Sequence, residues 1–330
     1  METGLFQKKE RVMKVLSAGL AFCDIPLSPV PGNILEIDNS SIEMPVSHTG
    51  GDALTVAVVL SKLGIQASFA GKIGKDINGQ FIRKELVKNG VNTDMLIEDD
   101  SYGTAVSYIL IEESGERHFL VNRGANDGLL SRDIPDEAVR EADLVFFGSA
   151  LAMQRMTDGE IADLFKRAHA YGKITAMDAS IATEAKAQRN LKLIEKSLNE
   201  TDIFIPSYEE AVFFTGKTDV KEMLEIFGGF SLKILGIKLG HKGCVLTNFK
   251  ETVWLSAYPD VKVVDTTGAG DCFMAGFLCG YLHGWDLRRI GEFASAVSAH
   301  GIAASGASTG IPDFETVLKY AKANGNKLCI

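Results

Sequence analysis

The sequence predicts an α/β protein with three layers, in which a doubly wound, mostly parallel sheet lies between two layers of helices and carries a small β-sheet lid. Strand-like apolar runs alternate with helix-like runs along most of the 330 residues, which is typical of a parallel sheet covered on both faces. Two segments, 33–46 and 103–122, interrupt this alternation with patterns typical of antiparallel strands. No repeat or low-complexity linker divides the chain, so we expect a single domain over 1–330 with the lid segments inserted in it.

The strands of the main sheet are expected at short apolar runs that are bounded by turn residues. In chain order these runs are 12–20, 68–73, 143–149, 173–178, 203–206, 234–239 and 243–248. Helices are expected where apolar residues recur at spacings of three and four. In chain order these segments are 52–63, 78–89, 157–171, 208–215, 220–227, 271–283 and 287–304.

The second lid segment has the pattern of a β-hairpin. A turn, Glu113-Ser114-Gly115-Glu116, separates the apolar runs 108–111 and 118–121. An alternative is that both lid segments extend the edge of the main sheet. They interrupt βα units at different points of the chain, however, which favours a separate small sheet over a cleft.

Composition indicates which partners the protein binds. The formal charge of −9 and the pI near 5.3 argue against a nucleic-acid-binding face. The longest apolar stretch beyond the first strand, 53–60, is far shorter than the roughly 20 residues of a transmembrane helix. Five cysteines occur without a Cys-x-x-Cys pair, as in a reducing cytoplasm. We therefore expect a cytoplasmic protein that binds small molecules, without nucleic-acid or membrane partners.

A glycine turn near the C-terminal end, Asp265-Thr266-Thr267-Gly268-Ala269-Gly270-Asp271, opens directly into an apolar helix. The first N–H groups of such a helix lack intrahelical partners and carry partial positive charge, so this end can bind a phosphate. Gly268 and Gly270 have no Cβ, which lets the backbone approach a phosphoryl oxygen closely. Asp271 could cap the helix or act as a general base, and the turn by itself leaves both roles open.

Two other phosphate-binding loops are excluded. The dinucleotide fingerprint requires a third glycine where Phe273 stands. No Gly-x-x-x-x-Gly-Lys-Ser/Thr run occurs in the chain. The role of the glycine turn therefore has to be inferred from the rest of the sequence.

Further motifs accompany the glycine turn in a recognisable order. Asp24 is expected to end the first strand, 50–52 (Gly-Gly-Asp) opens an apolar helix, 71–79 joins a strand to a helix, and 240–243 turns between two strands. Together with 265–271, the most specific element, this set resembles the ribokinase-like (PfkB) family of carbohydrate kinases over nearly the whole chain. The resemblance implies the ribokinase-like fold, ATP and Mg²⁺ as cofactors, and a homodimer formed through the lid, which is similar to the family's β-clasp.

The resemblance also implies roles for individual residues. Asp271 would be the base that takes the proton from a substrate hydroxyl, and the amides of Gly268, Ala269 and Gly270 would stabilise charge on the transferred phosphoryl group. Substrate-binding positions would be Asp24, Gly50, Gly51, Asp52 and Thr55. Nucleotide-binding positions would be Ser207, Lys238, Gly240, Gly243, Thr266 and His300. Metal-binding positions would be Glu210, which organises Mg²⁺ through water, and Asp265 with the Thr267 carbonyl, which bind the monovalent cation (K⁺) that activates some members.

Three positions depart from the family's pattern. Thr55, Ser207 and His300 stand where an Asn is usual, and Thr and Ser lose the paired donor and acceptor of the amide. Arg123, at the end of the second lid segment, is expected to point toward the cleft, where its guanidinium could bind a substrate carboxylate or phosphate. The other interpretation is a solvated arginine at a strand end. The first interpretation would add sugar acids, such as 2-keto-3-deoxygluconate, and sugar phosphates to the neutral sugars.

We therefore expect an enzyme that phosphorylates a hydroxyl of a sugar or sugar acid at the expense of ATP. One alternative is a nucleoside kinase of the same fold, for which Tyr108 or Phe119 of the lid could clamp a base. Another is a non-catalytic sugar-sensing homologue. The retention of Asp271 and of the glycine turn argues against the sensor.

Overall fold

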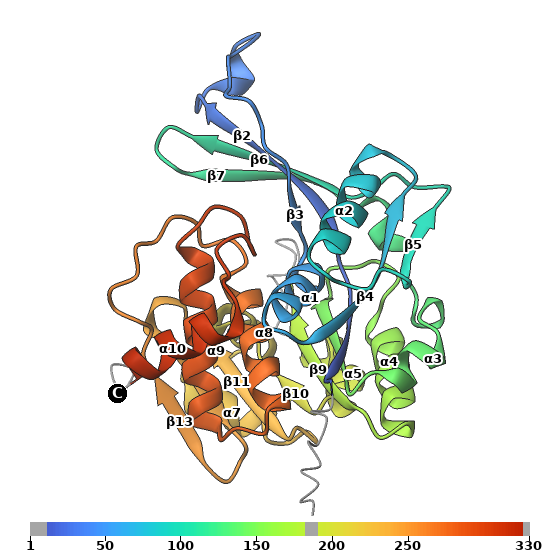
Figure 1. The fold of residues 1–330 in the computed structure, drawn as a ribbon, viewed down its shortest axis with the longest axis vertical. Coiled ribbons are helices and arrows are strands. Elements are labelled where there is room, and N and C mark those ends of the chain that lie inside the picture. The colour runs from blue at the N-terminus through green and yellow to red at the C-terminus, as the bar shows by residue number, and fades with distance from the viewer. Residues whose placement is uncertain (1–11, 182–190, 326–330) are drawn as a thin grey trace, which may run out of the picture.

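A computed structural model describes residues 12–181 and 191–325 and confirms the three-layer α/β architecture (Figure 1). The described residues form a nine-stranded main sheet in the order β13-β12-β11-β10-β9-β8-β1-β4-β5. Its strands are β1 (Lys14–Ala18), β4 (Gln66–Gly74), β5 (Leu96–Asp99), β8 (Leu144–Ala150), β9 (Ile174–Ala179), β10 (Ile203–Phe204), β11 (Ile234–Lys238), β12 (Cys244–Thr247) and β13 (Thr252–Leu255). All neighbouring strands pair in parallel except for the antiparallel pairs β11–β12 and β12–β13.

Helices cover both faces of the main sheet because the apolar residues of its strands alternate between two cores. Val15 and Phe146 lie in one core, whereas the adjacent Leu16 and Phe147 lie in the other. The helices on the first face are α1 (Asp52–Lys62), α2 (Ile77–Lys88), α8 (Ala269–Leu282), α9 (Leu287–Ile302) and α10 (Phe314–Asn324). Those on the second face are α3 (Asp136–Glu141), α4 (Asp158–Ala170), α5 (Glu195–Asn199), α6 (Tyr208–Thr215) and α7 (Val220–Phe227).

The lid is a separate four-stranded sheet in the order β3-β2-β6-β7, and it extends from one end of the molecule above the helices (Figure 1). Its strands are β2 (Phe22–Val30), β3 (His48–Gly50), β6 (Val106–Glu112) and β7 (Arg117–Asn122). The pairing puts Asp24 beside Ser107, Ser107 opposite Val121 and Ile111 opposite Arg117. Because side chains alternate along a strand, Asp24, Phe119 and Arg117 share one face of the lid, which we call the cleft face.

The structure corrects two expectations about the lid. Segment 33–46 is not a strand: apart from a short 3₁₀ turn, Ile34–Glu36, it has no regular structure, and Leu35 and Met44 are almost fully exposed. Its alternating pattern therefore has no core to face. Asp24 does not end the first strand but lies inside β2, a strand that was not expected from the sequence and that contains Pro26 and Pro29.

Other differences are smaller. The elements β5, β13, α3, α5 and α10 were not expected from the sequence. The helix after the glycine turn begins at Ala269, two residues earlier than expected. Among the described residues, none of the helices has both the length and the apolar character needed to cross a bilayer.

Candidate functional site

The glycine turn has the geometry of an anion-binding helix end. Gly268 precedes α8 with φ of 73°, and a Cβ at this position would collide with Ala307. The N–H of Ala269 donates to the Thr266 carbonyl at 3.2 Å. No hydrogen bond within the described residues uses the N–H groups of Gly268, Gly270 or Asp271. The donors available to an anion are therefore those of Gly268, Gly270 and Asp271, whereas the predicted donor Ala269 is used within the turn.

Asp271 lies in a largely enclosed cluster of buried and half-buried charged side chains, which come from five parts of the fold. The cluster has four carboxyl groups: Asp271 at the start of α8, Asp52 at the start of α1, Asp178 in β9 and Glu210 in α6. Their shared ammonium group is Lys238 at the end of β11, which forms an ion pair with Asp178. A Cβ on Gly270 would lie 3.3 Å from the Lys238 Nζ, so the ammonium adjoins the anion-binding turn.

The cluster makes its carboxyl groups hold their protons unusually tightly. Burial, followed by the charge of Asp52, raises the pKa of Asp271 to about 8. Burial and then Asp178 raise the pKa of Glu210 to about 7, and burial raises that of Asp178 to about 6. Burial alone would lower the pKa of Lys238, but Asp178 and Glu210 outweigh it and raise the pKa. Asp271 can therefore exchange a proton near neutral pH, as a general base must.

Local structure fixes the position of the Glu210 carboxylate. The Ser207 N–H donates to the Glu210 Oε2 at 2.7 Å, and the Glu210 N–H donates to the Ser207 Oγ at 3.2 Å, which forms a capping box at the start of α6. Ser207, predicted to bind nucleotide, thus acts here as a helix cap. A set of carboxylates beside an anion-binding turn is the donor chemistry that Mg²⁺ prefers, so the cluster fits this ion.

A cavity of about 290 Å³ adjoins the glycine turn. Its wall includes six predicted residues: Lys238, Gly240, Gly243, Thr266, Ala269 and Gly270. The remaining wall is mostly apolar and includes Tyr258, Val261, Val263, Phe273 and Ala299, which sequence reasoning missed because they lie far apart in the chain. An apolar cavity that ends at an anion-binding turn suits a nucleotide, whose base is apolar and whose phosphates are charged.

His300 lies next to this cavity without lining it. Its ring packs edge-on against Tyr320 at 5.0 Å between centroids, and burial lowers its pKa. Its buried Nε2 has no hydrogen-bond partner among the described residues. The predicted contact of His300 with a nucleotide thus stays a prediction.

The predicted substrate residues fall into two groups. The Asp24 carboxyl packs against Gly50, where any Cβ would collide with it, and burial raises its pKa to about 6. Gly51 caps α1 with φ of 97° and accepts the Thr55 N–H at 2.9 Å. Asp52 instead joins the Asp271 cluster, where its Oδ1 accepts the hydroxyl of Ser149, a residue that sequence reasoning missed.

Arg123 lies at the end of the lid but is already engaged. Its Nη1 donates to the Ala152 carbonyl in the loop after β8 at 2.5 Å. The structure therefore brings Asp24 and Gly50 together, and Asp52 and Asp271 together, whereas Arg123 is held by the main domain.

A different lid arginine, Arg117, contacts the glycine turn directly. Its Nη1 donates to the Asp265 Oδ1 at 2.8 Å and to the Thr267 Oγ1 at 2.9 Å. Asp265 and Thr267 are the residues that the family resemblance assigns to a monovalent cation. The Arg117 guanidinium binds the Asp265 carboxylate and the Thr267 hydroxyl, and its charge would repel a cation held by that carboxylate and the Thr267 carbonyl. These residues as arranged here therefore do not fit such a cation.

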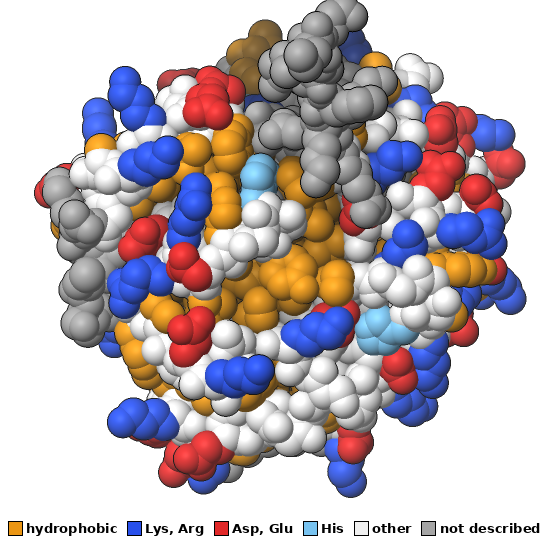
Figure 2. Space-filling model, turned by 60° about the horizontal axis from the view of Figure 1, so that its bottom comes forward, with side chains coloured by type: hydrophobic (Ala, Val, Ile, Leu, Met, Phe, Trp, Pro, Cys, Tyr) orange, Lys and Arg blue, Asp and Glu red, His pale blue; other side chains and the backbone are white. Residues whose placement is uncertain are grey.

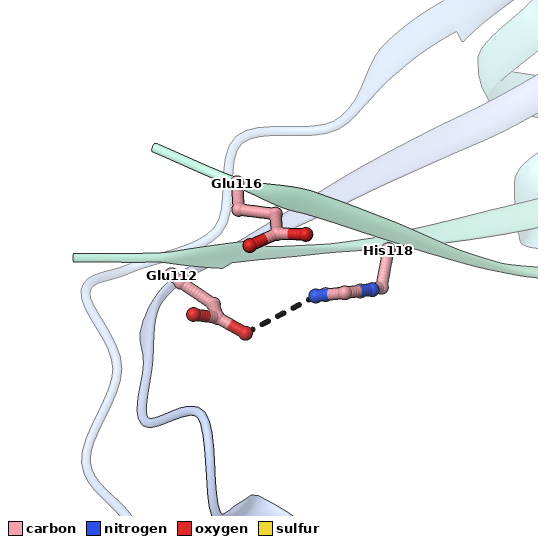
Figure 3. A group of neighbouring side chains, drawn as sticks. All are labelled: Glu112, Glu116 and His118. Atoms are coloured by element: carbon pink, nitrogen blue, oxygen red, sulfur yellow. Dashed lines mark hydrogen bonds and ion pairs between the residues drawn. The ribbon is translucent and has the colours of Figure 1, made fainter. Parts of the chain in front are cut away.

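A second group of potential metal ligands lies on the lid hairpin (Figure 3). Glu112, Glu116 and His118 each offer one ligand atom, and these atoms lie within 4.8 Å of one another. The His118 Nε2 is 3.1 Å from the Glu112 Oε1, so these two side chains already form a pair. All three are at least partly exposed, and we assign them no metal.

The fold and this site define a kinase that phosphorylates an alcohol group. The family model of the pfkB family carbohydrate kinases matches residues 15–313, and the chain belongs to this family. It is 33% identical over 254 residues to an uncharacterized sugar kinase from Archaeoglobus fulgidus, which covers 77% of this chain and 98% of that protein.

Solved structures share the fold. The ribokinase from Arabidopsis thaliana, complexed with ribose and ATP, superposes with a TM-score of 0.80 at 24% identity, covering 94% of this chain and 98% of the other. A double mutant of the fructokinase from Vibrio cholerae O395, in its fructose-, ADP- and potassium-bound form, superposes with a TM-score of 0.79 at 22% identity, covering 94% and 98%. At these identities the likeness establishes the fold alone.

Proposed function

We propose that this kinase transfers the γ-phosphoryl group of ATP to a hydroxyl of a sugar or sugar acid, with Asp271 as the general base. The observation that carries this proposal is the position of Asp271, which lies half-buried beside the free amides of the glycine turn and has a pKa raised to about 8. A carboxyl group with this pKa can accept a proton from a hydroxyl near neutral pH.

In the proposed reaction the nucleotide lies in the cavity beside the glycine turn, with its phosphates toward Gly270 and Lys238. The substrate oxygen attacks the γ-phosphorus and its proton passes to Asp271, while the bond to the bridging oxygen breaks and ADP leaves. The amides of Gly268 and Gly270 stabilise the charge on the transferred group. Mg²⁺, held through water by Glu210, would neutralise phosphate charge when bound.

The substrate is proposed to lie between Asp24 and Asp271, under the cleft face of the lid. Asp24 and the backbone at Gly50 and Gly51 would bind sugar hydroxyls, with Thr55 close by. Arg123 uses one N–H to reach the Ala152 carbonyl, and its other donors could bind a carboxylate, which is why we keep sugar acids beside neutral sugars.

A nucleoside kinase is the second candidate function. Of the two aromatic residues considered for a base clamp, Phe119 lies on the cleft face and is 54% exposed. Tyr108 pairs with Ile25, one position out of phase with Asp24, and therefore points to the opposite face. Phe119 alone supports the nucleoside alternative.

We also propose that the protein is a cytoplasmic homodimer of small-molecule-binding subunits. The lid face opposite the cleft exposes the hydrophobic side chains Tyr108 and Leu120, which a second lid could cover. The four cysteines in the described residues are unpaired and buried, as suits a reducing compartment. On the face shown in Figure 2, acidic and basic side chains are mixed and basic side chains form no continuous patch, which argues against a nucleic-acid-binding surface on that face.

A coupled assay of ADP release tests this function. Mg²⁺-ATP would be supplied with a panel of ketoses, aldoses, sugar acids, sugar phosphates and nucleosides, and Asp271→Asn would serve as the inactive variant. We expect turnover on one sugar class that the variant loses while it still binds nucleotide. Turnover on nucleosides only would establish the second candidate, and stabilisation by a sugar without any ADP release would indicate a sugar-sensing protein.

A further inference from the structure

Arg117 connects the lid to the anion-binding turn. It is the first residue of β7, directly after the hairpin turn, and lies on the cleft face together with Asp24. Its Nη1 donates to both Asp265 and Thr267, which are 148 and 150 residues away in the chain. The tip of the lid is thus fastened to the residues that immediately precede Gly268.

Asp265 is where three parts of the site meet. Its Oδ1 accepts from Arg117 at 2.8 Å and from the Thr267 N–H at 2.9 Å, and its Oδ2 accepts from the Gly306 N–H at 3.1 Å. The lid, the glycine turn and the loop after α9 are therefore joined through one carboxylate. With these donors acting together against burial, the pKa of Asp265 falls to about 2, so the carboxylate is always charged at neutral pH.

The contact differs from an ordinary surface ion pair, which contributes little because water screens it. The Asp265 side chain is only 12% exposed and that of Arg117 31% exposed. A guanidinium that also donates to a second group at 2.9 Å is fixed in orientation. The geometry therefore fixes both the position of the positive charge and the orientation of the Arg117 guanidinium.

A K⁺ ion at this position would compete with Arg117 for the Asp265 carboxylate. Potassium is held by several oxygen atoms that replace its hydration shell. Both Asp265 oxygens already accept hydrogen bonds, and a cation next to the Arg117 guanidinium would be repelled by its charge.

We propose that Arg117 is a positioning residue that supplies, from the lid, the positive charge that a monovalent cation supplies at this turn in other members of the family. This inference rests on the proposed kinase function. It has two consequences: the enzyme needs no K⁺, and the anion-binding turn is fully ordered only when the lid lies over the cleft.

The test compares two salts of equal ionic strength, KCl and tetramethylammonium chloride, whose cation is too large to enter the site. Wild type, Arg117→Ala and Arg117→Lys would be measured in each. One readout is thermal stabilisation by Mg²⁺-ADP, which requires no turnover, and the other is kcat/KM for ADP release. Arg140→Ala is the matched control, because Arg140 also pairs with a carboxylate, at 2.6 Å, but on the surface of α3.

We expect the wild type to behave alike in both salts. Loss of a hydrogen-bonded charge should lower kcat/KM of Arg117→Ala by about ten- to a hundredfold in tetramethylammonium, and K⁺ should restore most of it, because the emptied site can then bind the ion. Arg117→Lys keeps the charge and should remain insensitive to K⁺. Arg140→Ala should match the wild type in both salts.

Three outcomes would overturn the inference. A wild type that requires K⁺, or an Arg117→Ala variant that is equally impaired in both salts, would refute the role of Arg117 and leave the kinase function standing. The comparison of the wild type and Arg117→Lys decides the matter even if Arg117→Ala does not fold. A wild type that Mg²⁺-ADP stabilises in neither salt would overturn the proposed function and this inference together.

Discussion

Replacing Asp271 by Asn should stabilise the ligand-free protein while it abolishes turnover. Asp271 is one of four carboxyl groups, Asp178 buried and the other three half-buried, that surround the ammonium of Lys238. Ionising all four carboxyl groups in one place is unfavourable without Mg²⁺ because their negative charges repel one another, and this repulsion together with burial raises the pKa of Asp271. The amide of Asn has nearly the same shape but no charge, so the variant no longer opposes folding as the pH rises.

The size of the change in unfolding free energy follows from the pKa of Asp271. In the unfolded chain the Asp271 carboxyl ionises near 3.8, whereas in the folded protein its pKa is about 8. Between these values the folded state holds one more proton, so this group lowers the free energy of unfolding by about 1.4 kcal/mol for each pH unit. From pH 4 to pH 7 the stability difference between Asp271→Asn and the wild type should therefore widen by up to about 4 kcal/mol.

The direction in which stability changes with pH distinguishes this effect from acid denaturation. A carboxyl group whose pKa is raised by folding contributes stability at low pH and loses that contribution as the pH rises toward 8. The wild type should thus become less stable between pH 5 and pH 8, and Asp271→Asn should follow a shallower slope. Comparing slopes also removes the constant effect of burying the new amide, which is independent of pH.

The assay is urea unfolding of the ligand-free proteins with a chelator present, followed at several pH values from 5 to 8. Asp100→Asn is the matched control, because it removes a carboxylate that is 77% exposed and paired with Lys75 at the surface. Its pH slope should equal that of the wild type. A difference between Asp271→Asn and wild type that stays constant or narrows with rising pH would refute the electrostatic account of the cluster.

Three further predictions concern the turn, the substrate side and the rate. Gly268→Ala should destabilise the protein by about 2 to 4 kcal/mol in denaturant unfolding, because the left-handed conformation and the steric overlap with Ala307 both oppose a Cβ. The control is Gly172→Ala, where φ is 68° but the space is open, so only the cost of the left-handed conformation should appear. Equal losses of unfolding free energy in the two variants would contradict the steric part of this prediction. Gly50→Ala should raise the KM for the sugar at least about tenfold and leave the KM for ATP unchanged, because its Cβ displaces the Asp24 carboxyl. Steady-state kinetics with each substrate varied in turn would measure both constants, and an increase in the KM for ATP instead of that for the sugar would contradict this prediction. The kcat/KM of the wild type should rise with pH toward about 8 as Asp271 ionises, and a flat profile between pH 6 and pH 8 would argue against this base.

Much of the fold could be predicted because its signals are local. The alternation of apolar strands with helices that bury one face is set by neighbouring residues, and it predicted the three-layer architecture correctly. Segment 33–46 failed because alternation is a necessary feature of a half-buried strand but not a sufficient one. The missed strand β2 contains prolines, which are tolerated because β3 pairs only with Phe22–Asp24 and because the pairing with β6 is irregular between Leu27 and Val30.

For the site, the sequence by itself determined the contiguous chemistry. The glycine turn and Asp271, the proposed base, lie within seven residues, so their types and spacing indicate an anion-binding helix end before any folding is considered. Only the tertiary structure decided which distant groups meet there. Lys238 and Asp178 are 60 residues apart, and Arg117 and Asp265 are 148 apart. The carboxyl ends of parallel strands bring the first pair together, and the reach of a lid hairpin brings the second, because charged groups interact through space and not along the chain.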